Sequence, residues 1–320
     1  MALETQMSRY GAIAKSLPMG SGKVFFVLNA SDAYAGDFQN EYPVDKDGVP
    51  RVYIGAANYA DLAIQAALDA CVANRNDYVF VMPSAATYTL NAALTMSKKN
   101  VHLIAPGGLG RANGSNNSTR VQAAAACNFV DISAASVEIA GFYIKNYTAI
   151  GAIGCAAGST AVAPWIHHNT FFIATASGAN LPIITGTALG DGGWFGVIED
   201  NHFLTYGVAG GTMTGVILFA GAAGMMQVNR NHIGIATIVC ATGISIAGNG
   251  SEVCDNYLYE IGVGAGSTAG TLTIGIQLSG ASVAINNRIG MATTDIIAGN
   301  GNYFAIGNVG GLAGTTAWIQ

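Results

Sequence analysis

The chain has 320 residues, of which 10% are charged, and its formal net charge is −5. An average soluble domain has roughly a quarter charged residues, so we expect much of this surface to be covered by partner subunits or to be made polar by serine, threonine and asparagine. The acidic balance and the scattered basic residues argue against a nucleic-acid partner.

Residues 1–57 differ from the remainder, because their aromatic residues fall outside any repeated pattern. Residues 23–28 and 49–54 read as two strands that pair around a turn at 45–48. We interpret this part as an arm that docks on a partner, although a plug at one end of the remaining chain explains the same features. The candidate docking residues are Tyr10, Phe25, Phe26, Phe38 and Tyr42.

The run Gly20-Ser21-Gly22-Lys23 is similar to part of a phosphate-binding loop, but the pattern is broken. Leu17 stands where the first glycine belongs, and Val24 stands where a serine or threonine would hold Mg²⁺. We therefore predict no nucleotide site and no other cofactor.

Neither export nor membrane insertion is predicted. Glu4 and Arg9 interrupt the amino-terminal stretch, and no apolar segment typical of a secretion signal follows them. Residues 203–228 carry no charge, but they are too rich in glycine and threonine for a typical membrane helix. The five cysteines form no C-x-x-C pair, so we expect small buried side chains in a reducing compartment.

Residues 58–74 are predicted to form a helix. Asn58 can cap its start, Asp61 favours the first turn, and apolar residues recur on one side at 60, 64, 67, 68, 71 and 72. Strand patterns follow at 78–82, 87–90, 101–104 and 137–144. A helix in this place can cover the open end of a stack of strands.

Two short phrases recur between residues 165 and 289. In the first, an asparagine is followed by a polar or aromatic residue and then an apolar one, and its asparagines lie 32, 30, 25 and 31 residues apart by subtraction. In the second, a glycine (215, 243 or 275) precedes alternating apolar residues. Such self-similarity indicates a solenoid. We predict that Asn169, Asn201, Asn231, Asn256 and Asn287 stack as a hydrogen-bonded ladder, with five unrelated turn asparagines as the alternative.

Over about residues 58–310 these elements resemble right-handed parallel β-helix proteins of the pectin-lyase-like type. The resemblance implies an all-β fold, a right-handed single-stranded parallel β-helix over 58–320 with its cap helix at 58–74. The repeats rich in glycine and alanine, the unrelated residues 1–57 and the absence of an export signal resemble β-helix virion proteins of tailed phages. Those proteins serve as capsid decoration (cement) proteins, spikes or fibres, usually as trimers.

Many β-helices cleave polysaccharides, but their motifs are missing here. Asn-Thr-Asp, Asp-Asp and Gly-His-Gly do not occur, Arg288-Ile289-Gly290 lacks the lysine of Arg-Ile-Lys, and the acids are too sparse for a calcium site. The best pair for glycan hydrolysis joins Glu199 or Asp200 to Asp255, two coils and roughly 10 Å away. Solvated surface charges explain the same residues. The candidate acids and their neighbouring histidine are Asp191, Glu199, Asp200, His202, Glu252, Asp255 and Glu260.

Four histidines lie in or beside the asparagine phrases: His167, His168, His202 and His232. His202 and His232 directly follow ladder asparagines, so we expect them to stack outward on neighbouring coils. A metal could bind there, but ordinary surface histidines are the simpler interpretation, and no metal is predicted.

We therefore expect a non-enzymatic phage virion protein, a capsid decoration (cement) protein that forms a homotrimer and docks on the major capsid protein or another virion protein. It would be assembled in the host cytoplasm, with neither nucleic acid nor membrane as a partner. A tail spike or fibre that binds or depolymerises glycan is the alternative, and a bacterial surface adhesin is a third hypothesis that the missing export signal disfavours.

Overall fold

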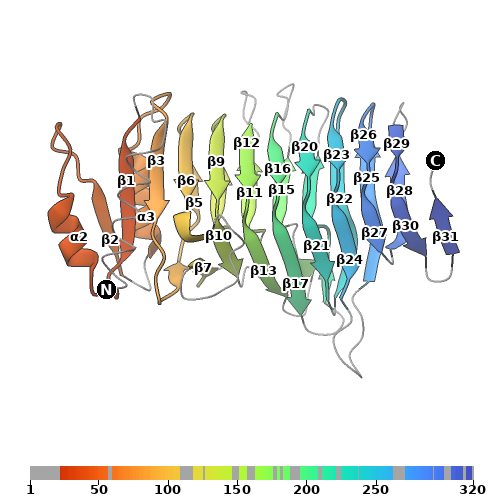
Figure 1. Ribbon diagram of the computed structural model, residues 1–320, viewed down its shortest axis with the longest axis horizontal. Helices are drawn as coiled ribbons and strands as arrows, with labels where there is room; N and C mark the ends of the chain where they lie inside the picture. The colour runs from red at the N-terminus through yellow and green to blue at the C-terminus, as the bar shows by residue number, and fades with distance from the viewer. Residues whose placement is uncertain are drawn as a thin grey trace.

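The computed structural model is a solenoid whose coils follow one another along its long axis, with the amino-terminal part at one end and the carboxyl-terminal part at the other (Figure 1). The structure describes residues 22–56, 60–108, 118–124, 127–145, 151–156, 163–175, 179–180, 183–187, 195–207, 211–220, 225–236, 238–261, 271–290, 292–298, 304–312 and 315–318.

Three long sheets run side by side along the axis. In spatial order, sheet 1 contains β2 (Val52–Gly55), β1 (Val24–Asn29), β3 (Asp77–Val81), β6 (Val101–Ile104), β9 (Val137–Ala140), β12 (Pro164–His167), β16 (Val197–Glu199), β20 (Gln227–Asn229), β23 (Glu252–Cys254), β26 (Val283–Ile285) and β29 (Phe304–Ile306). Sheet 2 contains β4 (Tyr88–Leu90), β7 (Thr119–Ala123), β10 (Phe142–Lys145), β13 (Thr170–Thr175), β17 (His202–Gly207), β21 (His232–Ile235), β24 (Tyr257–Glu260), β27 (Arg288–Gly290), β30 (Val309–Leu312) and β31 (Thr315–Trp318).

Sheet 3 completes each coil. It contains β5 (Leu94–Met96), β8 (Val130–Ile132), β11 (Ile153–Ala156), β15 (Ile184–Thr187), β19 (Ile217–Ala220), β22 (Val239–Ala247), β18 (Thr212–Met213) and β14 (Ala179–Asn180), and it continues from β22 through β25 (Thr271–Ser279) to β28 (Ala292–Ala298). Among the described strands, neighbours within a sheet run parallel except β30 and β31, which are antiparallel. The chain visits the sheets in the order 1, 2, 3, and this is the predicted right-handed parallel β-helix.

Alternation along each strand places every second side chain inside the solenoid, where it stacks on its equivalent from the next coil. In sheet 1, Ile139, Ile166 and Ile198 are in register. In sheet 2, the rings of Phe171 and Phe203 are stacked with centroids 4.6 Å apart. These side chains are fully buried, and each contributes roughly 1.5–3 kcal/mol of burial free energy. The register therefore follows from matching apolar residues coil by coil.

The turn from sheet 1 to sheet 2 takes two residues and is built in the same way on successive coils. Its first residue has a left-handed backbone, with φ between 54° and 57°, and the residues at this position are His168, Asp200, Arg230, Asp255 and Asn286. Its second residue is a buried asparagine. Outside glycine, asparagine, aspartate and histidine adopt this conformation most readily, so Arg230 is the unusual residue at this turn.

The predicted asparagines form one continuous column. The side-chain Nδ2 of Asn201 donates to Oδ1 of Asn231 at 3.1 Å and to the carbonyl of Ile166 at 2.8 Å. Its Oδ1 accepts the backbone N–H and the side-chain Nδ2 of Asn169, at 3.0 and 3.1 Å. The same pattern recurs from Asn169 through Asn287. The buried side-chain amide of each asparagine from Asn201 to Asn287 therefore uses both of its N–H donors and both lone pairs of its oxygen.

The column is longer than the sequence pattern indicated. Its carboxyl-terminal member is Asn308, which accepts from Asn287 and donates to the carbonyl of Ala284. At the other end, the backbone N–H of Phe142 donates to Oδ1 of Asn169. Gly141 takes the left-handed position there, because a Cβ at this residue would lie 2.2 Å from the carbonyl oxygen of Ala105.

The helix predicted over 58–74 is present as α3 (Ala60–Ala70). Its buried face, with Ile64, Ala67 and Leu68, joins the core of the solenoid. α3 packs against β1, β2, β3, β4 and β5, so it covers the amino-terminal end of the interior, as expected. Asn58, the predicted cap, lies outside the described residues.

The interpretation of Phe25, Phe26 and Phe38 as surface docking residues is wrong. Phe25 faces the core, whereas Phe26 and Phe38 pack together on the outer side of sheet 1 with ring centroids 5.1 Å apart, and all three are at most 4% exposed. Phe38 belongs to a helix that the sequence did not indicate, α2 (Ala35–Glu41), which covers Phe26. Tyr42 follows this helix and packs partly buried against the ring of Phe38. Tyr10 lies outside the described residues.

The two strands of this segment are also arranged differently from the predicted hairpin. β1 and β2 are parallel, with Phe26 opposite Val52, and β1 pairs on its other side with β3. The parallel arrangement is possible because α2 provides a crossover between the strands. The turn predicted at 45–48 is present, with the N–H of Gly48 donating to the carbonyl of Asp45 at 3.0 Å. Residues 24–55 thus continue the solenoid at its amino-terminal end.

The asparagine column predicts a large effect for one small substitution. Asn231→Ala removes the acceptor of two hydrogen bonds from Asn201 and the donor to Ile198 and Asn256. Since each buried polar group left without a partner costs about 1–3 kcal/mol, we expect the free energy of unfolding to fall by about 2–5 kcal/mol in urea titrations. The matched control is Asn40→Ala on the exposed side of α2, which should change it by less than about 0.5 kcal/mol. Equal effects of the two substitutions would contradict the role of the column.

Candidate functional site

A groove of about 730 Å³ follows the turn between sheets 1 and 2 over successive coils. It is lined by the left-handed turn residues, by the first outward residues of sheet 2 and by one tyrosine: His168, Asp200, Arg230, Asp255, Asn169, Thr170, Asn201, His202, His232 and Tyr259. The buried asparagines hold the turn, so the preceding residue of each turn points its side chain outward. Neighbouring coils lie about 4.8 Å apart, which brings these side chains together.

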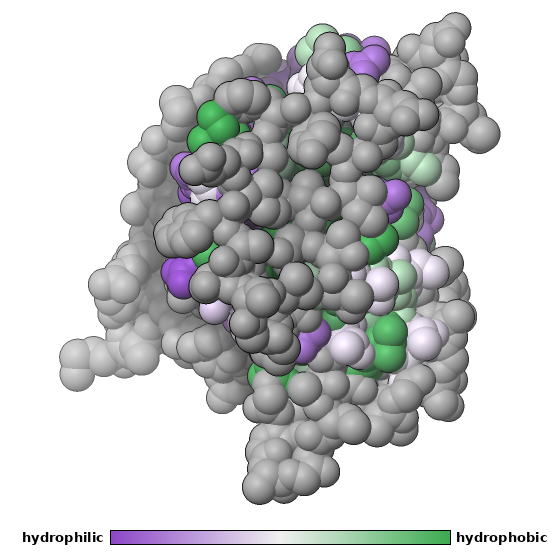
Figure 2. Space-filling view, turned by 90° about the vertical axis from the view of Figure 1, so that its right-hand side faces the viewer, coloured by the Kyte–Doolittle hydropathy of each residue, from purple (hydrophilic) through white to green (hydrophobic). Residues whose placement is uncertain are grey.

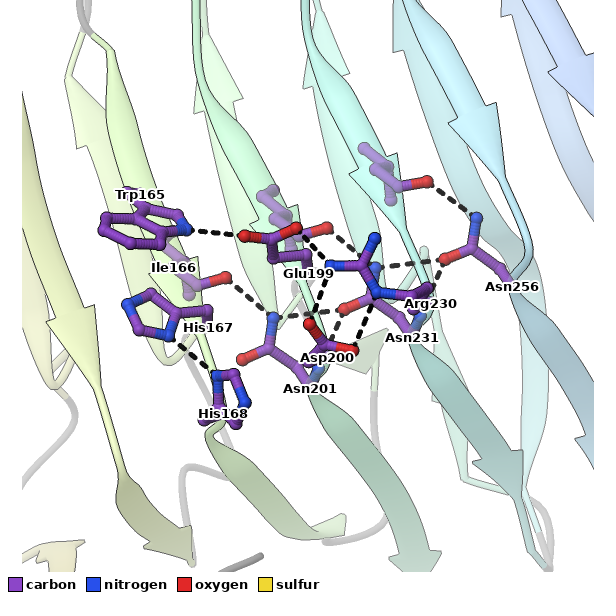
Figure 3. Close-up of polar contacts among 12 residues, drawn as sticks. Trp165, Ile166, His167, His168, Glu199, Asp200, Asn201, Arg230, Asn231 and Asn256 are labelled. Carbon is purple, nitrogen blue, oxygen red and sulfur yellow. Dashed lines mark hydrogen bonds and ion pairs between the residues drawn. The ribbon is translucent and has the colours of Figure 1, made fainter. Parts of the chain in front are cut away.

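Arg230, Asp200 and Glu199 form an ion-pair cluster at the turn between sheets 1 and 2 (Figure 3). The guanidinium of Arg230 binds both oxygens of Asp200, at 3.0 and 2.8 Å, and Oε2 of Glu199 at 2.5 Å. The hydrogen bonds from Arg230 lower the pKa of Asp200, although burial opposes them. Oε1 of Glu199 accepts from the indole N–H of Trp165 at 2.9 Å. Asp200 is thus held ionised, and Arg230 is fixed by the coil before it.

The residues of sheet 2 that line the groove are Thr170 and three ring-bearing residues, His202, His232 and Tyr259. His202 and His232 are in register on neighbouring strands and both line the groove, so their predicted outward alignment on neighbouring coils is confirmed. Their rings meet edge to face, with centroids 6.2 Å apart. The hydroxyl of Tyr259 lies 3.5 Å from Nε2 of His202. The neighbouring Gly234 leaves room for this tyrosine, because a Cβ there would approach its ring to 3.1 Å.

A second polar network leads into the groove from the outer side of sheet 1. Glu138 accepts hydrogen bonds from Nδ1 of His102 at 2.5 Å and from Nε2 of His167 at 2.8 Å. Burial alone would raise the pKa of Glu138, but these two hydrogen bonds outweigh it and lower the pKa to about 2. His167 is stacked on Trp165 and lies 2.8 Å, Nδ1 to Nδ1, from His168 in the groove.

The structure brings together some of the acids considered from the sequence and separates others. Asp200 and Asp255 line the groove together with His202. Glu199 lies beside the groove and contacts it through Arg230. Glu252 is an exposed residue of β23, and Glu260 accepts the backbone N–H of Leu272, so neither lines the groove. Asp191 lies outside the described residues.

This arrangement limits what the acids can do. A glycosidase needs one protonated and one ionised carboxyl group, and the lowered pKa of Asp200 fits the ionised one alone. Arg230, on the coil between Asp200 and Asp255, is paired with Asp200. Within the described residues, no group of three or more histidine, cysteine, aspartate or glutamate side chains is arranged to hold a metal ion. The groove presents carboxylates, imidazoles, a guanidinium and a tyrosine hydroxyl, all of which can form hydrogen bonds with a polar ligand.

The cysteines add no chemistry to the groove. Burial raises the pKa of Cys71, Cys155 and Cys240 to about 12, so these thiols are protonated and unreactive near neutral pH. They are buried and free of disulfides.

No helix in the described part of the chain is long and apolar enough to cross a membrane.

Comparisons with known proteins add little to this geometry. No family model matches the sequence, and no curated protein matches it. Among solved structures, the chain is similar to ORF18 of Geobacillus virus E2, with 10% sequence identity and a TM-score of 0.25, over 91% of this chain and 74% of that chain. A similarity of this size carries no argument. The class that the fold itself defines is the right-handed parallel β-helix, and the pectin-lyase-like resemblance stays a prediction.

The network around Glu138 predicts a specific loss of stability in acid. The ordinary pKa of a glutamate is 4.5, and that of folded Glu138 is about 2. The contribution of the Glu138 carboxylate to the free energy of unfolding is therefore complete above about pH 4.5 and disappears as the pH falls towards 2. We expect the loss of unfolding free energy between pH 6 and pH 3 to be about 2 kcal/mol smaller in Glu138→Gln than in the natural chain. Identical pH profiles for the two proteins, measured by urea titration, would rule out this coupling.

Proposed function

We propose that this chain is a non-enzymatic structural protein of a phage virion, and specifically a capsid decoration (cement) protein that assembles as a homotrimer. The observation that carries the proposal is the continuous asparagine column along the solenoid. It supports a mechanical role, because the column ties coil to coil with buried hydrogen bonds that a loosely packed repeat would lack.

The construction of the solenoid supports a role as a stiff spacer. Each central strand is hydrogen-bonded to the coil before it and to the coil after it, and apolar side chains stack in register inside. Such a rod resists bending at every coil, because any opening breaks backbone bonds and exposes core at once. A protein that reinforces or extends a particle surface needs that property.

The outer surface supports association with other subunits. Large apolar side chains face solvent on neighbouring coils, among them Trp165, Phe195 and Met225, which are 43%, 48% and 60% exposed. The carboxyl-terminal end, which faces the viewer in Figure 2, presents hydrophobic and hydrophilic described residues side by side. Together with the low share of charged residues, these surfaces are typical of a chain that is partly covered in its assembly.

A second candidate function is a tail spike or fibre that binds glycan. The specific observation in its favour is the groove, where carboxylates, imidazoles, a guanidinium and a tyrosine hydroxyl converge beside exposed aromatic rings. Planar rings and polar groups in one groove are well suited to sugar faces and hydroxyls.

Quantitative mass spectrometry of purified phage particles tests the proposal. We expect hundreds of copies of the chain in each particle, and we expect the isolated protein to have a mass in light scattering close to three times the 32.6 kDa of one chain. Absence from particles would contradict the virion role, and a monomeric mass would contradict the trimer. A handful of copies, with clearing of bacterial capsule that Asp255→Ala or Glu199→Ala abolishes, would establish the second candidate in its place.

A further inference from the structure

The two imidazole nitrogens of His168 differ in their hydrogen bonds. His168 lines the groove and is half-buried, and its Nδ1 is engaged by Nδ1 of His167. Among the described residues, none makes a hydrogen bond with its other nitrogen, Nε2. The two nitrogens of an imidazole point in nearly opposite directions, so Nε2 is directed away from His167, as the orientation of the two rings in Figure 3 illustrates.

The hydrogen positions along this chain of contacts follow from the partners. The carboxylate of Glu138 can only accept, so Nε2 of His167, at 2.8 Å from Oε1, carries a hydrogen. In neutral His167 the other nitrogen, Nδ1, then has a lone pair. The 2.8 Å contact between the two Nδ1 atoms requires one hydrogen, and His168 must supply it. Neutral His168 is thereby fixed as the tautomer whose Nε2 has a lone pair.

Carboxylate groups lie close to both histidines of this pair. Glu138 lies directly behind His167, and its second oxygen is held by His102. On the groove side, the nearby charge is Asp200, which interacts electrostatically with both imidazoles. Arg230 and Glu199 complete the set of facing charges, and Arg230 is bound to Asp200 and Glu199 rather than to either ring. Carboxylates thus lie on both sides of the histidine pair.

We propose that Glu138, His167 and His168 form a hydrogen-bonded relay that holds Nε2 of His168 unprotonated, as a hydrogen-bond acceptor for a hydroxyl group of a ligand bound in the groove. His168 would contact the ligand, and Glu138 and His167 are positioning residues. The relay concerns the groove alone, so it does not depend on the presence of the chain in virions.

Nitrogen-15 NMR of the neutral protein tests the tautomers directly. Long-range proton–nitrogen spectra distinguish a hydrogen on Nδ1 from one on Nε2. We expect His168 to carry its hydrogen on Nδ1 and His167 to carry it on Nε2. A hydrogen on Nε2 of neutral His168 would overturn the proposal, because that nitrogen could then not accept a hydrogen bond.

Diethyl pyrocarbonate tests whether the nitrogen is reactive. The lone pair of an unprotonated imidazole nitrogen attacks one carbonyl, a nitrogen–carbon bond forms, and the released ethyl carbonate decomposes to ethanol and carbon dioxide. The modified ring then loses its other hydrogen, which the relay can accept at His167. We expect His168 to be modified faster than His202 and His232 when the products are mapped by mass spectrometry, and slower modification of His168 than of both would contradict the relay.

Glu138→Gln separates the relay from simple exposure. Loss of a carboxylate that orients an imidazole reduces its function on a scale of about tenfold, so we expect the modification rate of His168 to fall about tenfold while those of His202 and His232 stay unchanged. The matched control is Glu252→Gln, the same change at an exposed residue outside the groove, which should leave all three rates unaltered. An unchanged rate in folded Glu138→Gln would refute the relay. If this variant does not fold, the tautomers of the natural chain decide.

Discussion

The turn between sheets 1 and 2 depends on a buried amide group that has no hydrogen-bonding capacity to spare. Each asparagine between the two ends of the column accepts twice from the coil before it, and it donates both to the asparagine of the coil after it and to a strand carbonyl of sheet 1. A buried group without these partners would cost more than the turn could tolerate. Because the amides connect along the axis, the position of every coil is tied to that of its neighbours.

This constraint also creates the groove. A two-residue turn that gives one position to asparagine forces the other into a left-handed backbone and directs its side chain outward. Stacking then lines up His168, Asp200, Arg230 and Asp255 at the spacing of the coils. The structural amide is almost the same at each turn, whereas its neighbour is free to vary in charge. A repeated framework thus carries a non-repeated surface, and the chemistry of the molecule is concentrated at these neighbouring residues.

The sequence predicts well the features whose residues recur at regular spacing. The asparagine column has one asparagine in each coil, and the helix over Ile64 and Leu68 has apolar residues along one side. Asn308 was missed because a glycine precedes it and the phrase around it is shortened. The burial of Phe26 and Phe38 was not predicted, because α2 has no capping side chain that would have indicated a helix at this place.

The groove was predicted in part, since Asp200, His202, His232 and Asp255 follow from the repeat. The Glu138 network was not predicted, because His102 and His167 lie 36 and 29 residues from Glu138 and no local pattern connects them. Arg230 and Tyr259 were missed for a related reason. The coils differ in length, with asparagines 21 to 32 residues apart, so the residues that face each other become apparent once the register of the strands is known.

Hydrogen exchange of the asparagine side-chain amides, followed by NMR, tests the central claim most directly. The Nδ2 hydrogens of Asn201, Asn231 and Asn256 are buried and bonded to the neighbouring coils, and those of Asn40 are exposed. The account predicts that the first three exchange with deuterium orders of magnitude more slowly than Asn40, at rates near those of the core strands. Exchange of all four at the rate of an exposed amide would show that the coils are not joined by this column.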